Sequence, residues 1–121
     1  MDATFILPYS NKITVYSKTG CNNCDKVKML LEDFVESENK NENENEGIIL
    51  TTNDFTIVNC DKLLENNKEL FIFNVEQIIG KMPWQFPLVF ANGKLIGGFK
   101  ETVRYFDKIT LDKAFEQNKD F

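Results

Sequence analysis

Two cysteines, Cys21 and Cys24, enclose a pair of asparagines in the run Cys-Asn-Asn-Cys. A cysteine attacks as its thiolate, and the first turn of a helix favours that anion because free N–H groups and the positive end of the helix dipole lie there. The spacing lets the second sulfur reach back to a disulfide formed at the first. The pair therefore predicts thiol–disulfide exchange, with Cys21 attacking and Cys24 resolving. A metal site shared with a second chain or an outside thiol, and a purely structural pair, are the alternatives.

Lys18 and the dipeptide Phe86–Pro87 are candidates for a binding site beside these thiols. Lys18 precedes Cys21 by three residues and brings a positive charge close to it. Phe86–Pro87 opens a short apolar run, and a strand tolerates proline at an edge or at its first position. A cis peptide bond there would turn the Phe86 N–H and C=O towards a peptide-like ligand, whereas a trans proline at a sheet edge is the alternative.

A pair of glycines, Gly97–Gly98, precedes Glu101 and a helical pattern. Glycines allow the backbone to approach a ligand closely, and the start of the following helix offers free N–H groups to a carboxylate. A tight turn with a favourable negative charge at the helix start explains the same residues without a ligand. From these residues alone, both interpretations stay open.

The apolar pattern predicts the elements that position these residues. Alternating, β-branched runs predict strands, and apolar residues at helical spacing predict helices. Asn92-Gly93 between two apolar runs predicts a tight hairpin. The expected order is strand 13–16, a helix from Asp25, strand 55–58, helix 63–79, strand 87–91, strand 94–96, helix 101–107 and helix 111–117, the last with Thr110 as its N-cap.

The predicted helix 63–79 has an inner face and a possible break. Residues 63–67 could form a separate turn at its start. Its inner face is expected to consist of Leu70, Phe71, Val75, Ile78 and Ile79. Successive β-α-β units followed by a hairpin predict an α/β fold, a small mixed sheet with helices on its faces.

The composition narrows the functional class. The 121 residues fit one domain. The absence of histidine excludes Cys–His and Ser–His–Asp catalysis and zinc sites built on imidazole. An odd number of cysteines does not fit a secreted disulfide framework. With no run long enough to span a bilayer and no basic leader segment at Met1, the chain is expected to be cytoplasmic.

Most of the net charge of −5 lies in one segment. Residues 36–47 contain five Glu and one Lys, which together account for −4. We interpret residues 36–50, approximately, as an acidic Asn/Glu-rich insertion that forms a solvated loop or a helix extension. The remainder is nearly neutral and has no basic patch, so we expect binding to neither nucleic acid nor membrane.

Together, Lys18, the Cys21–Cys24 pair, Phe86–Pro87 and residues 97–101 resemble the motifs of the glutaredoxin family in their order and spacing. The resemblance covers residues 12–117, interrupted by the acidic insertion. It implies a thioredoxin-like fold, with a central four-stranded mixed sheet flanked by helices in a single domain of residues 1–121. It also implies a cis peptide bond before Pro87.

The resemblance further implies a groove for glutathione. Lys18 would pair with the glycine carboxylate, and the Phe86 backbone would lie as a strand against the cysteine of the tripeptide. The amides of Phe99 and Lys100 and the side chain of Glu101 would hold the γ-glutamyl end. The glutathione-binding residues so implied are Lys18, Phe86, Pro87, Gly98, Phe99, Lys100 and Glu101.

Three features depart from the family pattern. The usual Cys-Pro-Tyr-Cys is Cys-Asn-Asn-Cys here, which removes a proline suited to the first helical turn and an aromatic side chain beside the thiols. Trp84 stands where family members often carry a basic residue for glutathione, a role that Lys81 or Gln77 would have to take over. The usual Asp is Glu101, which is one methylene longer.

The activity implied by the resemblance is that of a monomeric glutathione-disulfide oxidoreductase. Its partners would be glutathione, as co-substrate, and glutathionylated or disulfide-containing proteins, with no metal. Two alternatives are a dimer that holds a [2Fe-2S] cluster through Cys21 and bound glutathione, and a thioredoxin-like protein disulfide reductase. Cys60 is expected to be a half-buried, inert thiol, with a regulatory or dimer-linking disulfide as the alternative.

Overall fold

The computed structural model describes residues 5–40 and 54–117, and side chains within 5–35 and 54–108. These residues form a four-stranded sheet in the order β2-β1-β3-β4 and three long helices. Strand β1 pairs parallel with β2 and antiparallel with β3, which pairs antiparallel with β4. The elements are β1 (Ile13–Ser17), α1 (Asn22–Lys40), β2 (Phe55–Asn59), α2 (Asp61–Ile79), β3 (Leu88–Ala91), β4 (Lys94–Gly97) and α3 (Phe99–Gln117).

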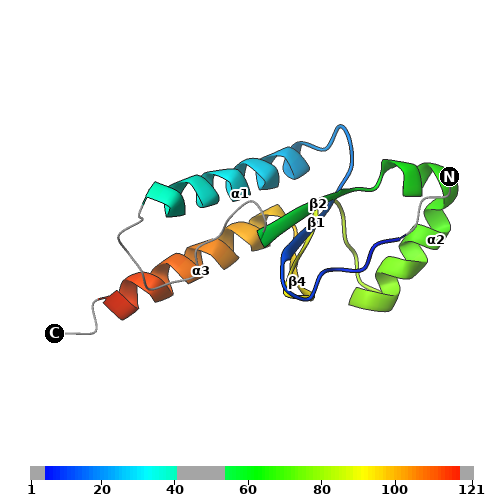
Figure 1. Ribbon diagram of the computed structural model, residues 1–121. Coiled ribbons are helices and arrows are strands. Elements are labelled where there is room, and N and C mark those ends of the chain that lie inside the picture. The colour runs from blue at the N-terminus through cyan, green and yellow to red at the C-terminus, as the bar shows by residue number, and fades with distance from the viewer. Residues whose placement is uncertain (1–4, 41–53, 118–121) are drawn as a thin grey trace.

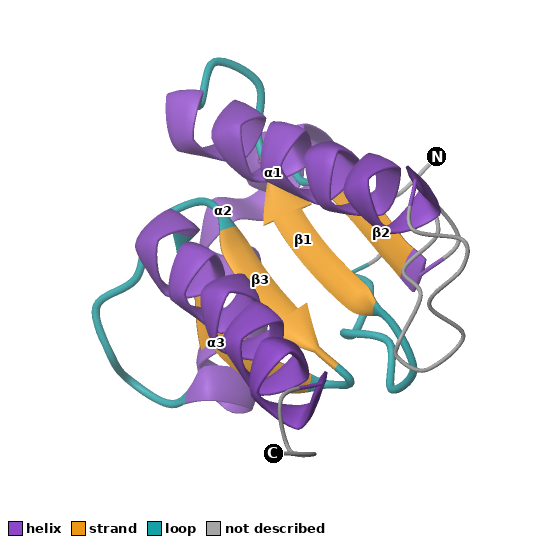
Figure 2. Cartoon of the chain, turned by 90° about the vertical axis from the view of Figure 1, so that its left-hand side faces the viewer, coloured by secondary structure: helices purple, strands orange, loops and turns teal. Residues whose placement is uncertain are grey.

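The sheet lies between two helical layers. Helices α1 and α3 cover one face, and α2 covers the other (Figures 1 and 2). On the α1 and α3 side, Val15 of β1 packs with Val27 of α1 and Phe106 of α3. On the α2 side, Tyr16 packs with Phe71 and with other apolar side chains of that cluster. The thioredoxin-like architecture expected from the sequence is confirmed.

The hairpin between β3 and β4 also follows the sequence. Asn92 and Gly93 both have positive φ, 53° and 83°, as a two-residue hairpin turn with the twist of its strands requires. Asparagine and glycine tolerate this conformation better than other residues. The turn therefore fixes β4 as the antiparallel edge of the sheet.

The C-terminal region is one helix rather than the two that the sequence predicts. Helix α3 runs without interruption from Phe99 to Gln117, so Thr110 lies within it and does not cap a second helix. The junction at residues 108–110 contains neither glycine nor proline, and nothing in its backbone chemistry ends a helix. The threonine was a misleading signal because it is tolerated inside helices as well as at their caps.

Helix α2 has a break at Asn67, whose φ of −162° and ψ of 90° are not helical. The Asn67 side chain accepts a hydrogen bond from the Leu70 N–H at 3.0 Å and so caps the second half of the helix. The predicted separate segment around residues 63–67 thus corresponds to a real break. In the segment after the break, Phe71 and Val75 are buried as expected, whereas Leu70 is 53% exposed and its predicted inward position is wrong. Leu70 lies about 100° around the helix from Phe71, so the two cannot both point to the centre of the buried face.

Helix α1 is described as far as Lys40, so the first residues of the acidic segment continue the helix. Most of the predicted insertion lies outside the described residues, and its role stays a prediction. Within 5–40 and 54–117, no helix has the length and apolar character that a membrane span needs.

Candidate active site

Cys21 occupies the N-cap of α1, which begins at Asn22. Its carbonyl accepts the first intrahelical hydrogen bond, from the Asp25 N–H at 3.1 Å. Its sulfur accepts a second bond, from the Cys24 N–H, also at 3.1 Å. The sulfur thus takes the place of the side-chain oxygen in an ordinary N-cap, where a negative charge is stabilised by the helix dipole. This sulfur is partly accessible to solvent.

Cys24 lies one turn further along α1 and is completely buried. Burial, with a further contribution from its hydrogen bond with Cys21, raises the pKa of the Cys24 thiol to about 12. A backbone hydrogen bond from Lys18 acts in the opposite direction but is outweighed. The two thiols of the pair therefore differ strongly in access, and the first is the one that an external disulfide can reach.

The loop that carries Lys18 and Cys21 is tied to the start of α2 by Asp61. This carboxylate accepts hydrogen bonds from both the N–H and the hydroxyl of Thr19, the former at 3.0 Å. These bonds to Thr19, the larger cause, and the nearby Lys18 charge lower the pKa of Asp61. Next to it, the Cys60 N–H donates to the Ser17 carbonyl at 2.8 Å. No local sequence pattern predicts this link, because Thr19 and Asp61 are 42 residues apart.

The peptide bond between Phe86 and Pro87 is cis, as the family resemblance implies. The Lys18 ammonium lies over the Phe86 ring, 5.5 Å from its centroid. An aromatic face attracts a cation at this distance, so the Phe86 ring helps to hold the Lys18 charge on this side of the site. Behind it, Trp84 packs edge-on against Phe86 with ring centroids 5.3 Å apart.

The start of α3 is closed by Glu101 in half of a capping box. Its Oε1 accepts a hydrogen bond from the Gly98 N–H at 2.9 Å, while the Gly98 carbonyl accepts the Thr102 N–H at 3.0 Å. At Gly97, φ is 132°, and a Cβ atom would lie 2.7 Å from the Glu101 Cγ, so this position requires glycine. The structural interpretation of Gly97–Gly98 and Glu101 is therefore correct. It is compatible with a ligand at the first N–H groups of α3, which have no intrahelical acceptor.

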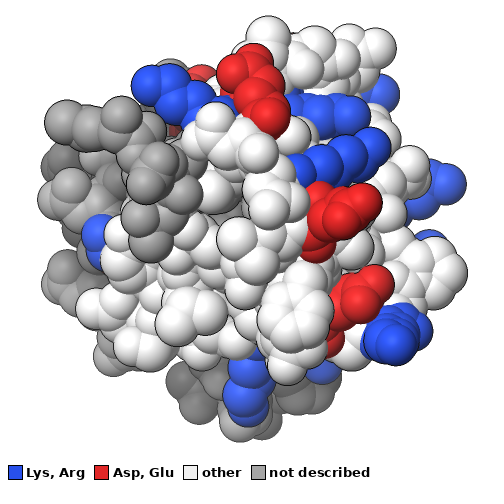
Figure 3. Space-filling model, turned by 90° about the vertical axis from the view of Figure 1, so that its right-hand side faces the viewer, with Lys and Arg blue, Asp and Glu red and all other residues white. Residues whose placement is uncertain are grey.

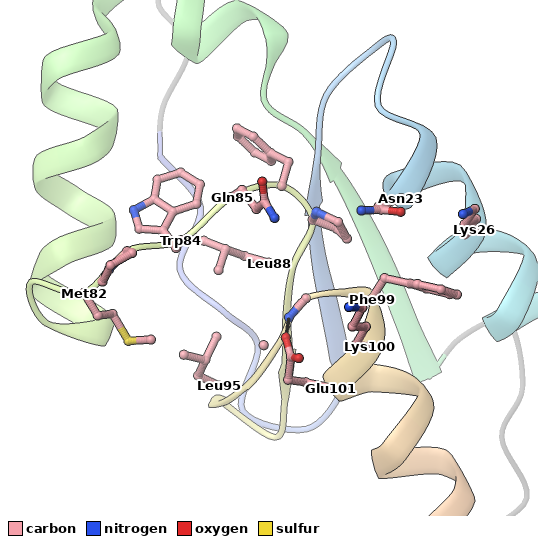
Figure 4. A pocket seen from close by; sticks show the side chains of 15 residues that line it. Asn23, Lys26, Met82, Trp84, Gln85, Leu88, Leu95, Phe99, Lys100 and Glu101 are labelled. Carbon is pink, nitrogen blue, oxygen red and sulfur yellow. Dashed lines mark hydrogen bonds between the residues drawn. The ribbon is translucent and has the colours of Figure 1, made fainter.

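A cavity of about 450 Å³ lies between the first turns of α1, the segment around the cis peptide bond and the start of α3 (Figure 4). This volume is in the range of about 300–1,000 Å³ that small-molecule sites have. Of the predicted binding residues, all but Lys18 line the cavity: Phe86, Pro87, Gly98, Phe99, Lys100 and Glu101. Cys21 does not line it, but Asn23 does, and Lys18 adjoins it through Phe86.

Several residues that line the cavity were not predicted. Lys26 of α1 places its ammonium 5.5 Å from the centroid of the Phe99 ring and adds a second cation on the α1 side. Met82, Leu88 and Leu95 give the opposite end an apolar wall (Figure 4). Helical spacing offered one usable signal, because Asn23 and Lys26 lie three residues apart on the same face of α1.

Trp84 lines the cavity at the place where the family pattern has a basic residue. The two substitutes considered from the sequence, Gln77 and Lys81, are both exposed and are not part of the cavity lining. The cations beside the cavity come instead from Lys18, Lys26 and Lys100.

Cys60 is completely buried, and not half-buried as expected. Burial raises the pKa of its thiol to about 12, and its sulfur lies 3.6 Å from the Val58 carbonyl oxygen. Such a thiol is poorly reactive in the folded chain. Among the residues that the structure describes, no three Cys, Asp or Glu side chains are grouped as a metal ion would require.

Charges of both signs lie close together on the face of the molecule shown in Figure 3, beside a broad area of uncharged side chains. The described part of that face carries no continuous basic surface. The expectation that nucleic acid is not a partner stays a prediction.

Solved structures of glutaredoxins are similar to this chain. The solution structure of the dithiolic glutaredoxin 2-C-Grx1 from Trypanosoma brucei brucei has a TM-score of 0.57 and 24% sequence identity, over 85% of this chain and 84% of the other. Reduced Escherichia coli glutaredoxin has a TM-score of 0.53 and 16% identity, over 80% of this chain and 94% of the other. No protein-family model and no curated protein matches the sequence. At these identities, the likeness establishes the fold.

Proposed function

We propose that this chain, which shares the fold of dithiol glutaredoxins, is a thiol–disulfide oxidoreductase that uses glutathione to reduce protein–glutathione mixed disulfides and some protein disulfides. The fold and the Cys21–Cys24 pair support the oxidoreductase part of this proposal. The dependence on glutathione rests on the residues around the cavity. The observation that carries most weight is that the Cys21 sulfur caps α1 and accepts the Cys24 N–H.

The first step is attack by the Cys21 thiolate on the glutathione sulfur of a glutathionylated protein. The Cys21–glutathione disulfide forms, the protein–glutathione disulfide breaks, and the protein leaves as a thiolate that takes a proton from water. In the second step, a glutathione thiolate attacks the glutathione sulfur on Cys21. Glutathione disulfide forms, and the electron pair returns to Cys21. The N-cap position favours Cys21 as both nucleophile and leaving group, because both roles require its anion.

Glutathione has a carboxylate at each end, and positive groups lie at two places, one beside the cavity and one in its lining. The Lys18 ammonium over Phe86 is suited to one carboxylate. The free N–H groups at the start of α3, with Lys100 beside them, are suited to the other. Between these places, the backbone on either side of the cis peptide bond can pair with the tripeptide backbone. Lys26 adds positive charge on the α1 wall, although the whole chain carries −5.

Turnover with glutathione, glutathione reductase and NADPH tests the proposal on a glutathionylated peptide. We expect steady NADPH consumption by the native chain and none above background by Cys21→Ser. Turnover that needs thioredoxin reductase in place of glutathione would contradict the proposal and favour a thioredoxin-like reductase. A visible absorbance band from an iron–sulfur cluster in anaerobically purified protein, without turnover, would favour the cluster-binding alternative.

A further inference from the structure

Ser17, the last residue of β1, has a buried hydroxyl for which neither the fold nor the proposed reaction accounts. The residue has no exposed surface, and its Oγ finds no hydrogen-bond partner among the described residues. It is the one side chain in the described part of the chain with this property. Buried polar groups are almost always paired in native proteins, so an orphan next to reactive groups calls for an explanation.

The hydroxyl lies on the side of the sheet that α1, the helix of the resolving cysteine, covers. Side chains alternate along a strand, so Ser17 shares a face of the sheet with Ile13 and Val15, both of which pack in one cluster with Val27 of α1. Residues 18–21 join Ser17 directly to α1, and Cys24 lies one turn before Val27 on the buried side of that helix. The strand end and the first turn of α1 therefore enclose the Ser17 hydroxyl and the Cys24 thiol in the same buried layer.

A second contact supports this placement. The thiol of Cys24 receives a backbone hydrogen bond from Lys18, the neighbour of Ser17. The charges of Cys21 and Lys28 also act on Cys24, and Cys24 acts in turn on the third thiol, Cys60. The third thiol, Cys60, belongs to the cluster on the opposite face of the sheet. The residue that follows β1 thus already donates to the Cys24 sulfur, which places the end of β1 close to that sulfur.

We propose that the Ser17 hydroxyl donates a hydrogen bond to the Cys24 sulfur when that sulfur becomes an anion during disulfide exchange. In the resting protein, the hydroxyl makes no bond to the neutral thiol. The buried thiolate needs a donor, and the unpaired Ser17 hydroxyl, on the same side of the sheet, is free to turn towards it when the charge develops. Ser17 then serves only the dithiol step. The inference builds on the oxidoreductase part of the proposed function but does not require glutathione.

In this step, the Cys24 thiol first loses its proton to solvent. The thiolate attacks the Cys21 sulfur of a mixed disulfide, the Cys21–Cys24 bond forms, and the bond between Cys21 and the outside sulfur breaks. The electron pair leaves on the outside thiolate. In the reverse direction, a thiolate reducing agent attacks Cys21 and Cys24 leaves as the anion. In both directions Cys24 carries negative charge while buried, and the Ser17 donor stabilises it.

The test is a stopped-flow reaction of the reduced chain with dithionitrobenzoate, a small aromatic disulfide. Yellow thionitrobenzoate is released once when Cys21 attacks the reagent and a second time when Cys24 displaces it from Cys21. For Ser17→Ala, we expect the second phase to slow by about ten- to a hundredfold, the range that one lost hydrogen bond to a charged group gives. The first phase, which depends on Cys21 alone, serves as the control in the same trace and should change less than about twofold.

Two further variants complete the design. Ser17→Thr keeps the hydroxyl and should restore most of the second phase. In a Cys24→Ser background, which shows only the first phase, Ser17→Ala should have no effect. Because Ala removes an unpaired polar atom, the midpoint of urea unfolding should not fall.

An unchanged second phase in Ser17→Ala would overturn the inference, as would equal slowing of both phases, which would indicate a structural role. The reagent contains no glutathione. A chain that shows the expected loss here but no turnover with glutathione would therefore refute the proposed function and leave the assignment of Ser17 intact.

Discussion

Replacing Cys21 by serine should remove nearly all reaction of the folded chain with iodoacetamide near neutral pH. Burial raises the pKa of both remaining thiols, Cys24 and Cys60, from the ordinary 9.0 to about 12. Each pKa unit is a factor of ten in the thiolate fraction, so each buried thiol holds roughly a thousandfold less thiolate than an ordinary cysteine. At pH 7 that fraction is about 10⁻⁵.

Steric protection acts in the same direction, because Cys24 and Cys60 have no exposed surface. The assay is the mass of the intact protein in quenched time points, for the native chain and for Cys21→Ser. We expect one carbamidomethyl group on the native chain and none on Cys21→Ser over the same period. The same two proteins in urea, where all thiols are accessible, should take up three groups and two groups, since the chain has three cysteines.

Labelling of folded Cys21→Ser at a rate within about tenfold of the urea sample would refute the reasoning, since the expected difference is about a thousandfold. It would show that the buried thiols are not suppressed and that access does not distinguish the members of the pair. The remaining label on Cys21→Ser should also increase about tenfold per pH unit between pH 8 and pH 11, because the thiolate fraction of a group with a pKa of about 12 does so.

Three other outcomes follow. Cys24→Ser should still reduce glutathione mixed disulfides but lose reduction of protein disulfides, and loss of both in the coupled assay would contradict the division of roles. Asp61→Ala should lower kcat/KM by about three- to tenfold, because the loop then loses both hydrogen bonds from Thr19. Asp61→Asn, which still accepts the Thr19 N–H, should lose less, and equal losses in the two variants would disprove the link. The folded chain holds the protons of both buried thiols more tightly than the unfolded chain does. The urea-unfolding free energy should therefore be level between about pH 7 and pH 9 and fall towards pH 12, less steeply in Cys60→Ala, and a rise over that interval would contradict the pKa direction.

The parts of the fold and site that the sequence predicts correctly depend on short-range chemistry. Asn92-Gly93 specifies a turn through the backbone preferences of two adjacent residues, and the structure has that turn. The spacing of Cys21 and Cys24 places one sulfur at a helix start and the other one turn in, where the structure has them. Such features need no knowledge of distant residues.

The features that sequence analysis missed depend on side chains from distant segments or on competing local signals. Asp61 accepts hydrogen bonds from Thr19, which lies 42 residues earlier in the sequence, and neither an Asp nor a Thr by itself indicates this pairing. Asn67 interrupts α2 and caps its second half through the Leu70 N–H. The cavity gains Lys26 because α1 packs beside the start of α3, a relation that no local pattern contains.

The most direct test of the account is whether Cys21 forms a stable mixed disulfide with glutathione. Cys24→Ser, incubated with glutathione disulfide and measured by intact mass, should gain one glutathionyl group, with peptide mapping locating it on Cys21. The paired change Lys18→Ala in the same background should weaken this reaction by about three- to thirtyfold, as expected for the loss of one partly exposed charge from a carboxylate site. No glutathionyl group on Cys24→Ser, or a group located on Cys60, would contradict the assignment of Cys21 as the attacking thiol.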